Sequence, residues 1–422
     1  MIIPVERPGD AWPELPLDAW SDTCATLHRW TQIVGKIRLA QSPWTNHSWH
    51  VTLYVTSRGL TTSPIPHGAR TFDVDFDFLR HQLTIQSSDG GSAHLPLEPQ
   101  SVAAFYGRLM HEMDRLGLHV DIDPKPNEVP DAIRFDLDES HAAYDRVYAR
   151  RFWQVLVQAD RVFKQFRARF IGKCSPVHFF WGAPDLAVTR FSGRRAPEHP
   201  GGIPNLPDPV TREAYSHEVS SCGFWPGGGS TPYPAFYSYA YPEPAGFPEA
   251  AVGPAGAFYS PDLREFLLPY DKVRLSDAPD ATLLEFLQTT YEAAANLANW
   301  DRAAQSDVRS LTRDALARAP TEPWLPGVSV RRGLEVGRPH GQQLDDLGDA
   351  DVIPIIAAPM AAGKPVTRPT LEMPLTESAP SHIEYAICRR TSPSRPTTVC
   401  TTHAESDRAP LARAAGRYRR AH

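Results

Sequence analysis

The chain has 422 residues, of which 41% are hydrophobic and 10% aromatic, and this composition excludes a wholly disordered or fibrous protein. Its formal net charge of -6, from 43 Lys and Arg against 49 Asp and Glu, argues against a nucleic-acid backbone as the main partner. With 42 prolines and 27 glycines, turns and extended loops should be frequent, so an all-helical bundle is also disfavoured.

The first part of the chain alternates between helical and strand patterns. Apolar residues recur at spacings of three and four over 17–40, which predicts an amphipathic helix. Strict alternation predicts strands at 49–56, 72–78 and 83–86, and a second helix follows at 100–116 between Pro99 and Gly117. Residues 1–120 are therefore expected to form one α+β half.

A similar order returns later in the chain. We expect a long helix at 139–170, strands at 177–191, 215–221 and 236–241, and helices at 261–267 and 281–300. Both halves also share Gly-Lys followed by Ser-Pro, at Gly35-Lys36 and at Gly172-Lys173. An internal duplication and a chance likeness both remain open. The prediction is an α+β fold with mixed or antiparallel sheets, in which the Asp- and Pro-rich residues 121–138 link the half 1–120 to the half 139–303.

The last part of the chain differs in composition. Beyond residue 303 the only aromatic Phe, Trp and Tyr residues are Trp324, Tyr385 and Tyr418, and Arg, Pro and Ala are frequent. Residues 304–422 are predicted to be a disordered tail, because few aromatics are available to build a core. A natural appendage and a reading-frame artefact are both compatible with this composition.

The cysteines and the N-terminal sequence indicate the cellular compartment of the protein. Five cysteines without a CxxC pair are poor material for a disulfide framework. Neither a basic region followed by a long apolar stretch nor an apolar run long enough for a bilayer is present in the sequence. We expect a soluble cytoplasmic protein with no membrane partner.

Three histidines, His50, His178 and His217, fall on separate predicted strands next to large aromatic residues. With Asp185 and Glu218 nearby, the candidate catalytic residues are His178, His217, Glu218 and Asp185. The same three histidines are candidate ligands for a divalent metal. However, no HxH, HExxH or HxxxH pair supports a metal, and strand histidines beside aromatics are often ordinary half-buried residues.

Candidate ligand-binding residues surround these histidines in the sequence. Arg190 and Arg194 could present a fork to a carboxylate or phosphate, although structural ion pairs compete with that role. His50, Trp181 and Trp225 could form a wall, and the Gly-rich stretches 198–202 and 223–229 could be either mobile loops or the rim of a pocket.

These segments carry a family resemblance. Residues 35–40, Asn46 through Pro66, Ser175 through Gly202 and Glu213 through Gly228 resemble an uncharacterised, mainly bacterial family known as domain of unknown function 5996. The likeness spans about residues 10–302. Ser48 departs from it, since the family pattern has a second Trp there. The resemblance implies domain limits and a choice of motifs, but no established activity.

Two functions are compatible with these features. The first is an enzyme or ligand-binding protein for a small polar or anionic molecule in a pocket lined by His, Trp and Arg. The second is a non-catalytic interaction module that uses the aromatic and Pro-rich stretch 224–258, including Tyr237 and Tyr239. A nucleic-acid partner is not expected, and the sequence does not determine the substrate, the reaction or the oligomeric state.

Overall fold

The computed structural model describes residues 11–203, 205–229 and 231–305. In the first half, the helices are η2 (Leu17–Ala19), α1 (Ser21–Gln41), η3 (Asn46–Ser48), α2 (Val102–Arg115) and η4 (Phe135–Leu137), and the strands are β1 (Tyr54–Val55), β2 (Gly59–Thr61), β3 (Ile65–His67), β4 (Arg70–Asp77), β5 (Gln82–Ser87) and β6 (Ser92–Pro96). In the second half, the helices are α3 (Arg146–Ala168), α4 (Asp208–Ala214), α5 (Tyr270–Arg274), α6 (Pro279–Leu297) and α7 (Arg302–Gln305), and the strands are β7 (His178–Phe180), β8 (Asp185–Arg195), β9 (His217–Trp225), β10 (Ala235–Tyr241), β11 (Phe258–Ser260) and β12 (Glu265–Pro269).

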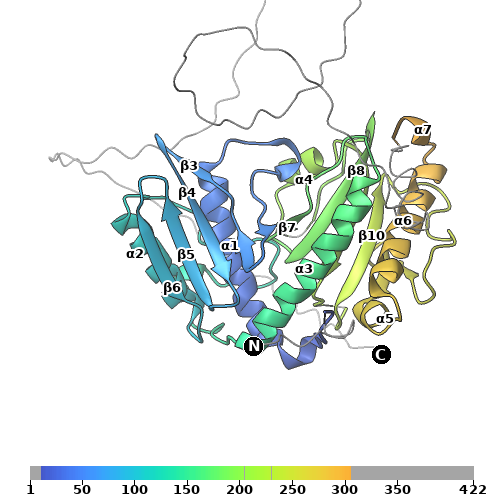
Figure 1. Cartoon of the computed structure of the whole chain (residues 1–422). Helices are drawn as coiled ribbons and strands as arrows, with labels where there is room; N and C mark the ends of the chain where they lie inside the picture. Colours follow the sequence, from blue (N-terminus) through green and yellow to red (C-terminus); the bar gives the residue numbers. More distant parts are fainter. Residues whose placement is uncertain (1–10, 204, 230, 306–422) are drawn as a thin grey trace, which may run out of the picture. The chain divides into compact units, whose positions relative to one another are not determined.

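The strands form two six-stranded antiparallel sheets (Figure 1). The first sheet has the order β1-β2-β4-β5-β6, with β3 also paired to β4, and the second has the order β11-β12-β10-β9-β8-β7. Each sheet is preceded in the chain by a long helix, α1 or α3, and followed by further helices. The α+β class with antiparallel sheets is therefore confirmed, and the two halves share the order helix, strands, helix.

One antiparallel bridge joins the two sheets. The backbone N–H of Leu53 donates to the carbonyl of Phe179 at 2.9 Å, and the N–H of Phe179 donates back to Leu53 at 2.7 Å. Both side chains are fully buried in a continuous core that also contains Trp12, Trp20 and Trp30. Burial of this much aromatic surface stabilises the described part of the chain as one unit.

Helix boundaries follow local capping chemistry. The Ser101 hydroxyl accepts from Ala104 N at the start of α2, and the Asp145 carboxylate accepts from Val147 N and Tyr148 N at the start of α3. The cap at Asp145 explains why α3 begins later than the predicted residue 139. Gly117 follows α2 with a φ of 64°, in the left-handed region expected at a helix stop.

Several predicted elements are corrected by the structure. The predicted helix 261–267 is wrong, because Glu265–Pro269 forms strand β12 between β10 and β11. Residues 49–56 form only the short strand β1, so His50 lies in a loop and not on a strand. The predicted strand 177–191 is a hairpin of β7 and β8. Residues 306–422, which contain nearly all of the predicted disordered tail, lie outside the described residues.

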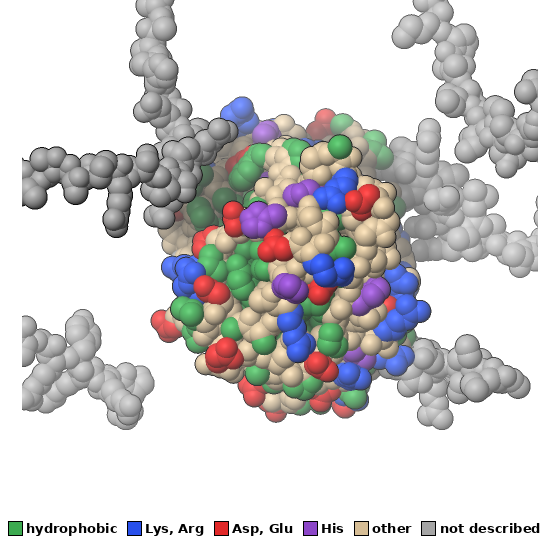
Figure 2. Space-filling view, turned by 90° about the vertical axis from the view of Figure 1, so that its left-hand side faces the viewer, with side chains coloured by type: hydrophobic (Ala, Val, Ile, Leu, Met, Phe, Trp, Pro, Cys, Tyr) green, Lys and Arg blue, Asp and Glu red, His purple; other side chains and the backbone are tan. Residues whose placement is uncertain are grey.

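Within the described residues, every helix is too short or too polar to cross a lipid bilayer. On the face that carries α2 and the first sheet, acidic and basic side chains are interspersed (Figure 2).

Candidate functional site

A cavity of about 560 Å³ lies against one face of the second sheet. Strand alternation decides which side chains reach it. On β8, Asp185, Ala187 and Thr189 line the cavity, whereas Leu186 and Val188 between them are fully buried in the core. The same alternation continues across the sheet, where the cavity-lining residues are Val219, Ser221 and Trp225 of β9, Tyr237 and Tyr239 of β10, and Glu265 of β12.

Segments from elsewhere in the chain complete the wall. Helix α4 and the loop 44–51 cover the open face, and they are joined at two points. The Trp44 indole donates to the Glu213 carboxylate at 2.8 Å, and His47 Nδ1 donates to the Ala214 carbonyl at 3.1 Å. Lys173 Nζ donates to the other His47 nitrogen, Nε2, at 2.8 Å, which fixes the tautomer of this ring.

Many of the side chains that line the cavity are aromatic. They are Trp44, Trp49, Trp181, Trp225, Phe180, Phe191, Tyr215, Tyr237 and Tyr239. Trp181 is held in place because its indole donates to the Val51 carbonyl at 2.7 Å and its ring covers Gly35, where a Cβ would come within 2.2 Å of the indole. The rim is apolar as well, since the exposed side chains of Trp44, Ile203 and Leu263 lie there.

Three carboxyl groups share this cavity, those of Glu128, Asp185 and Glu265. The pKa of Asp185 is raised to about 8, chiefly by burial, with a hydrogen bond from Tyr237 that lowers it and the neighbouring Glu128 and Glu265 that also raise it. Burial alone raises the pKa of Glu265 to about 7 and shifts that of Glu128 in the same direction. Among the described residues lining the cavity, none is Lys or Arg.

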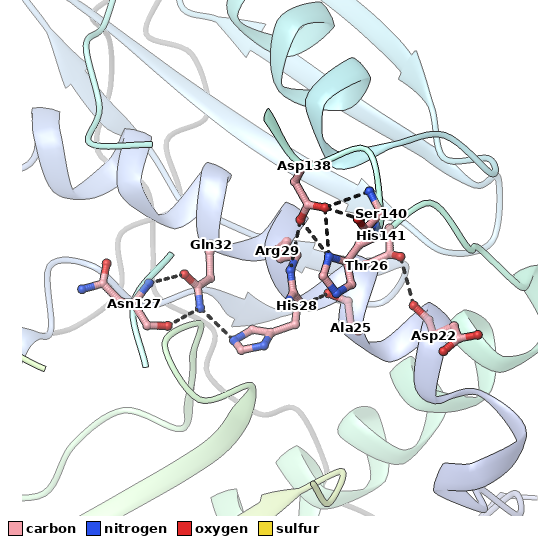
Figure 3. Close-up of polar contacts among 10 residues, drawn as sticks. All are labelled: Asp22, Ala25, Thr26, His28, Arg29, Gln32, Asn127, Asp138, Ser140 and His141. Carbon is pink, nitrogen blue, oxygen red and sulfur yellow. Dashed lines mark hydrogen bonds and ion pairs between the residues drawn. The ribbon is translucent and has the colours of Figure 1, made fainter. Parts of the chain in front are cut away.

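A polar clamp from helix α1 holds Asn127, the residue that precedes Glu128 in the chain (Figure 3). The Gln32 amide accepts from Asn127 N and donates to Asn127 O, both at 2.8 Å, and it also donates to Gly182 O at 3.2 Å. His28 Nε2 lies 2.8 Å from the same Gly182 oxygen. Glu128 follows in a left-handed conformation with φ of 55°, which is uncommon for a residue other than glycine.

The rings of His178 and His50, which line the cavity, are uncharged at neutral pH. His178 is only 1% exposed, and burial, together with the charge of Arg38, lowers its pKa to about 3. His50 Nδ1 bonds to the Thr45 backbone at 3.1 Å, and burial lowers the pKa of this ring too. Neither His178 Nδ1 nor His50 Nε2 has a hydrogen-bond partner within the described structure.

The structure brings together five of the residues predicted from sequence. His50, His178, Trp181, Asp185 and Trp225 all line the cavity. His217 lies at its edge, where its ring centroid is 6.0 Å from that of His47. No group of three or more His, Cys, Asp and Glu side chains in the described part of the chain is arranged to hold a metal ion, so His50, His178 and His217 do not form a ligand set there.

The two candidate arginines point elsewhere. Arg190 is 1% exposed on the opposite face of β8, where its guanidinium lies 3.4 Å from the ring centroid of Phe166 and 4.3 Å from that of Tyr291. Arg194 donates to Glu218 Oε2 at 2.7 Å and to the carbonyl of Ala298 at 2.6 Å at the end of α6. Arg190, Arg194 and Glu218 therefore have structural contacts and do not line this cavity.

Sequence reasoning missed the two glutamates. Glu265 falls in the segment predicted as a helix, and Glu128 falls in the segment predicted as a linker, with no local motif to mark it. The alternation of Tyr237 and Tyr239 with buried residues of β10 could have indicated that the two phenols face a cavity. From the sequence they are predicted to form an interaction surface instead.

Comparison with known proteins gives one match. Residues 12–307 match the family described as "Family of unknown function (DUF5996)", over more than half of the chain. No curated protein and no solved structure matches the chain.

Proposed function

The chain belongs to the DUF5996 family, whose function is unknown, and from this premise and the site geometry we propose that it binds a small molecule in the cavity against the second sheet. It does so as an enzyme or as a ligand-binding protein. The observation that supports the proposal is the cavity itself, whose volume of about 560 Å³ suits a small organic molecule. Its aromatic walls and few convergent polar groups are typical of such sites.

The geometry also narrows the class of ligand. An anionic ligand was expected from Arg190 and Arg194, but Arg190 is buried on the other face of β8 and Arg194 pairs with Glu218. The polar groups of the residues that line the cavity are carboxyls, phenols, hydroxyls, indole N–H groups, the Asn127 amide and neutral imidazoles. An anion would therefore find no Lys or Arg among the described lining residues to compensate its charge, and this disfavours it.

The alternative function, an interaction module, has less support. It depends on an exposed aromatic face in residues 224–258. Phe224 and Phe236 are fully buried in the core, and Tyr237 and Tyr239 line the cavity. These aromatic side chains are thus occupied in packing or in the cavity wall, although Phe258 is 42% exposed.

A thermal-shift screen of the full-length chain against metabolite-sized compounds tests the proposal. Hits are retested on Ala187→Trp, which fills the cavity floor, and on Ala104→Trp, a matched control on the exposed face of α2. We expect Ala187→Trp to abolish the shifts and Ala104→Trp to retain them. If hits bind a folded Ala187→Trp variant unchanged, the cavity is not the binding site.

Conversion of a bound compound distinguishes an enzyme from a protein that only binds its ligand. Incubation of each confirmed hit with the chain, followed by mass spectrometry of the small molecule, shows whether it is converted. Asp185→Asn and His178→Phe should abolish any conversion if these groups exchange protons with the ligand.

A further inference from the structure

We infer that the ligand of the cavity is a small organic cation, with an amine or quaternary ammonium group on an apolar body. This inference rests on the proposed function of the cavity and names the class of molecule that it takes. Three features of the wall favour such a ligand, namely its carboxyl groups, its aromatic surface and a buried histidine nitrogen without a partner in the described structure.

The carboxyl groups of the wall have no Lys or Arg partner among the described residues that line the cavity. Asp185 accepts a hydrogen bond from Tyr237, and none of the carboxyls of Glu128, Asp185 and Glu265 forms an ion pair with another described residue. Positive groups do occur nearby, but Lys173 contacts His47 and Arg38 lies near His178, on the histidine side. A carboxylate removed from water without a counter-charge is costly, so a bound cation would supply the missing partner.

The aromatic wall suits the same ligand. Tyr237 and Tyr239 stack with ring centroids 6.2 Å apart, and Tyr215 lies edge-on to Tyr239 at 6.1 Å. Trp181 and Trp225 belong to the same wall. The faces of Trp and Tyr rings attract ammonium groups, and more strongly where water is excluded. An acidic and aromatic wall therefore favours a cation over a neutral molecule of equal shape.

His178 provides an independent indication of a ligand. Its side chain is 1% exposed and lines the cavity, yet Nδ1 has no hydrogen-bond partner in the described structure. A buried polar atom without a partner is uncommon in native proteins. Because burial keeps this ring neutral, one of its nitrogens can accept a hydrogen bond, and the N–H of an amine is a suitable donor.

Matched probes of different charge test the inference. Phenethylammonium, phenethyl alcohol and phenylacetate share a phenyl ring and differ in the charge of the end group. Isothermal titration calorimetry of the full-length chain should show that phenethylammonium binds at least about tenfold more tightly than the alcohol and that phenylacetate binds least.

Variants of the carboxyl residues test whether these groups recognise the cation. Glu128→Gln and Glu265→Gln keep the shape of the side chain and remove its charge, so each should weaken phenethylammonium severalfold and leave the alcohol unchanged. Glu249→Gln, at an exposed position, is the matched control and should bind all probes as the wild type does.

The outcomes separate this inference from the proposed function. If the alcohol or phenylacetate binds as tightly as phenethylammonium, and Ala187→Trp blocks it, the cavity binds ligands but the cation inference is overturned. If phenethylammonium binds equally well to both glutamine variants, the carboxyls do not recognise it and the inference also fails. Absence of phenethylammonium binding up to about 10 mM overturns it as well.

Discussion

The phenol of Tyr237 on β10 donates a hydrogen bond to the carboxylate of Asp185 on β8, across the intervening strand β9. The residue of β9 opposite Tyr237 is Gly223. A Cβ at Gly223 would lie 2.4 Å from the Tyr237 ring, so only glycine lets the ring lie across β9. The pair joins a half-buried acid to a phenol at the floor of the cavity, and the titration of this acid should be measurable.

The first prediction concerns Asp185 and pH. Because the folded-state pKa of about 8 exceeds the usual value of 3.8, the folded protein binds more protons than the unfolded chain between these values, and stability falls as pH rises through that range. Asp185→Asn should reduce this fall in the free energy of unfolding, between about pH 5 and about pH 9, by roughly 1–3 kcal/mol. Urea unfolding at several pH values measures it, with Asp262→Asn, at an exposed position, as the control. An unchanged pH dependence would show that Asp185 ionises normally.

The second prediction concerns the contact between Gly182 and Glu128. A Cβ at Gly182 would lie 2.0 Å from the Glu128 carboxylate oxygen, so Gly182→Ala should displace this carboxyl. We expect phenethylammonium to bind roughly three- to tenfold more weakly. Gly107→Ala in helix α2 is the control, since its Cβ meets no atom within 4 Å and alanine favours the helix by about 0.5–1 kcal/mol. Equal affinities in the two variants would exclude a role for the position of Glu128.

The third prediction concerns the Gln32 clamp shown in Figure 3. Gln32→Leu removes both bonds to Asn127 and leaves part-buried backbone groups without these partners. The free energy of unfolding should fall by about 1–3 kcal/mol, and the Asn127 amide should exchange faster with deuterium. Gln154→Leu, at a half-buried position of α3, is the matched control and should leave that exchange rate unchanged. Unaltered exchange at Asn127 in Gln32→Leu would show that other contacts hold the segment.

The fourth prediction separates stability from binding at Arg190. Its guanidinium packs between the rings of Phe166 and Tyr291, and it donates to the Phe166 carbonyl. Arg190→Ala should lower the free energy of unfolding by roughly 2–4 kcal/mol through lost packing. Probe affinities measured on the folded fraction should stay within about twofold of wild type, because Arg190 lies outside the cavity. A selective loss of phenylacetate binding would instead return Arg190 to the ligand site. The exposed Arg195→Ala serves as the control for stability.

Local patterns predicted most of the secondary structure. The helices α1, α2, α3 and α6 and the strands β4, β5, β9 and β10 overlap the predicted ranges, because apolar periodicity and capping residues act over a few neighbouring positions. The error at 261–267 has the same origin. Leu263, Phe266 and Leu267 have helical spacing, but pairing with β10 and β11 places Glu265–Pro269 in the sheet.

Composition, local periodicity and contiguous motifs were enough to predict the α+β class, the family and five residues that line the cavity. Which face of β8 is open depends instead on how distant elements pack against the sheet. That choice placed Asp185 in the cavity and buried Arg190 under the helices, although both residues belong to one predicted strand. The same packing brings Glu128 and Glu265 close to Asp185 from distant parts of the chain. Strand alternation divides residues into two faces, but only the packing of other elements determines which face encloses a cavity.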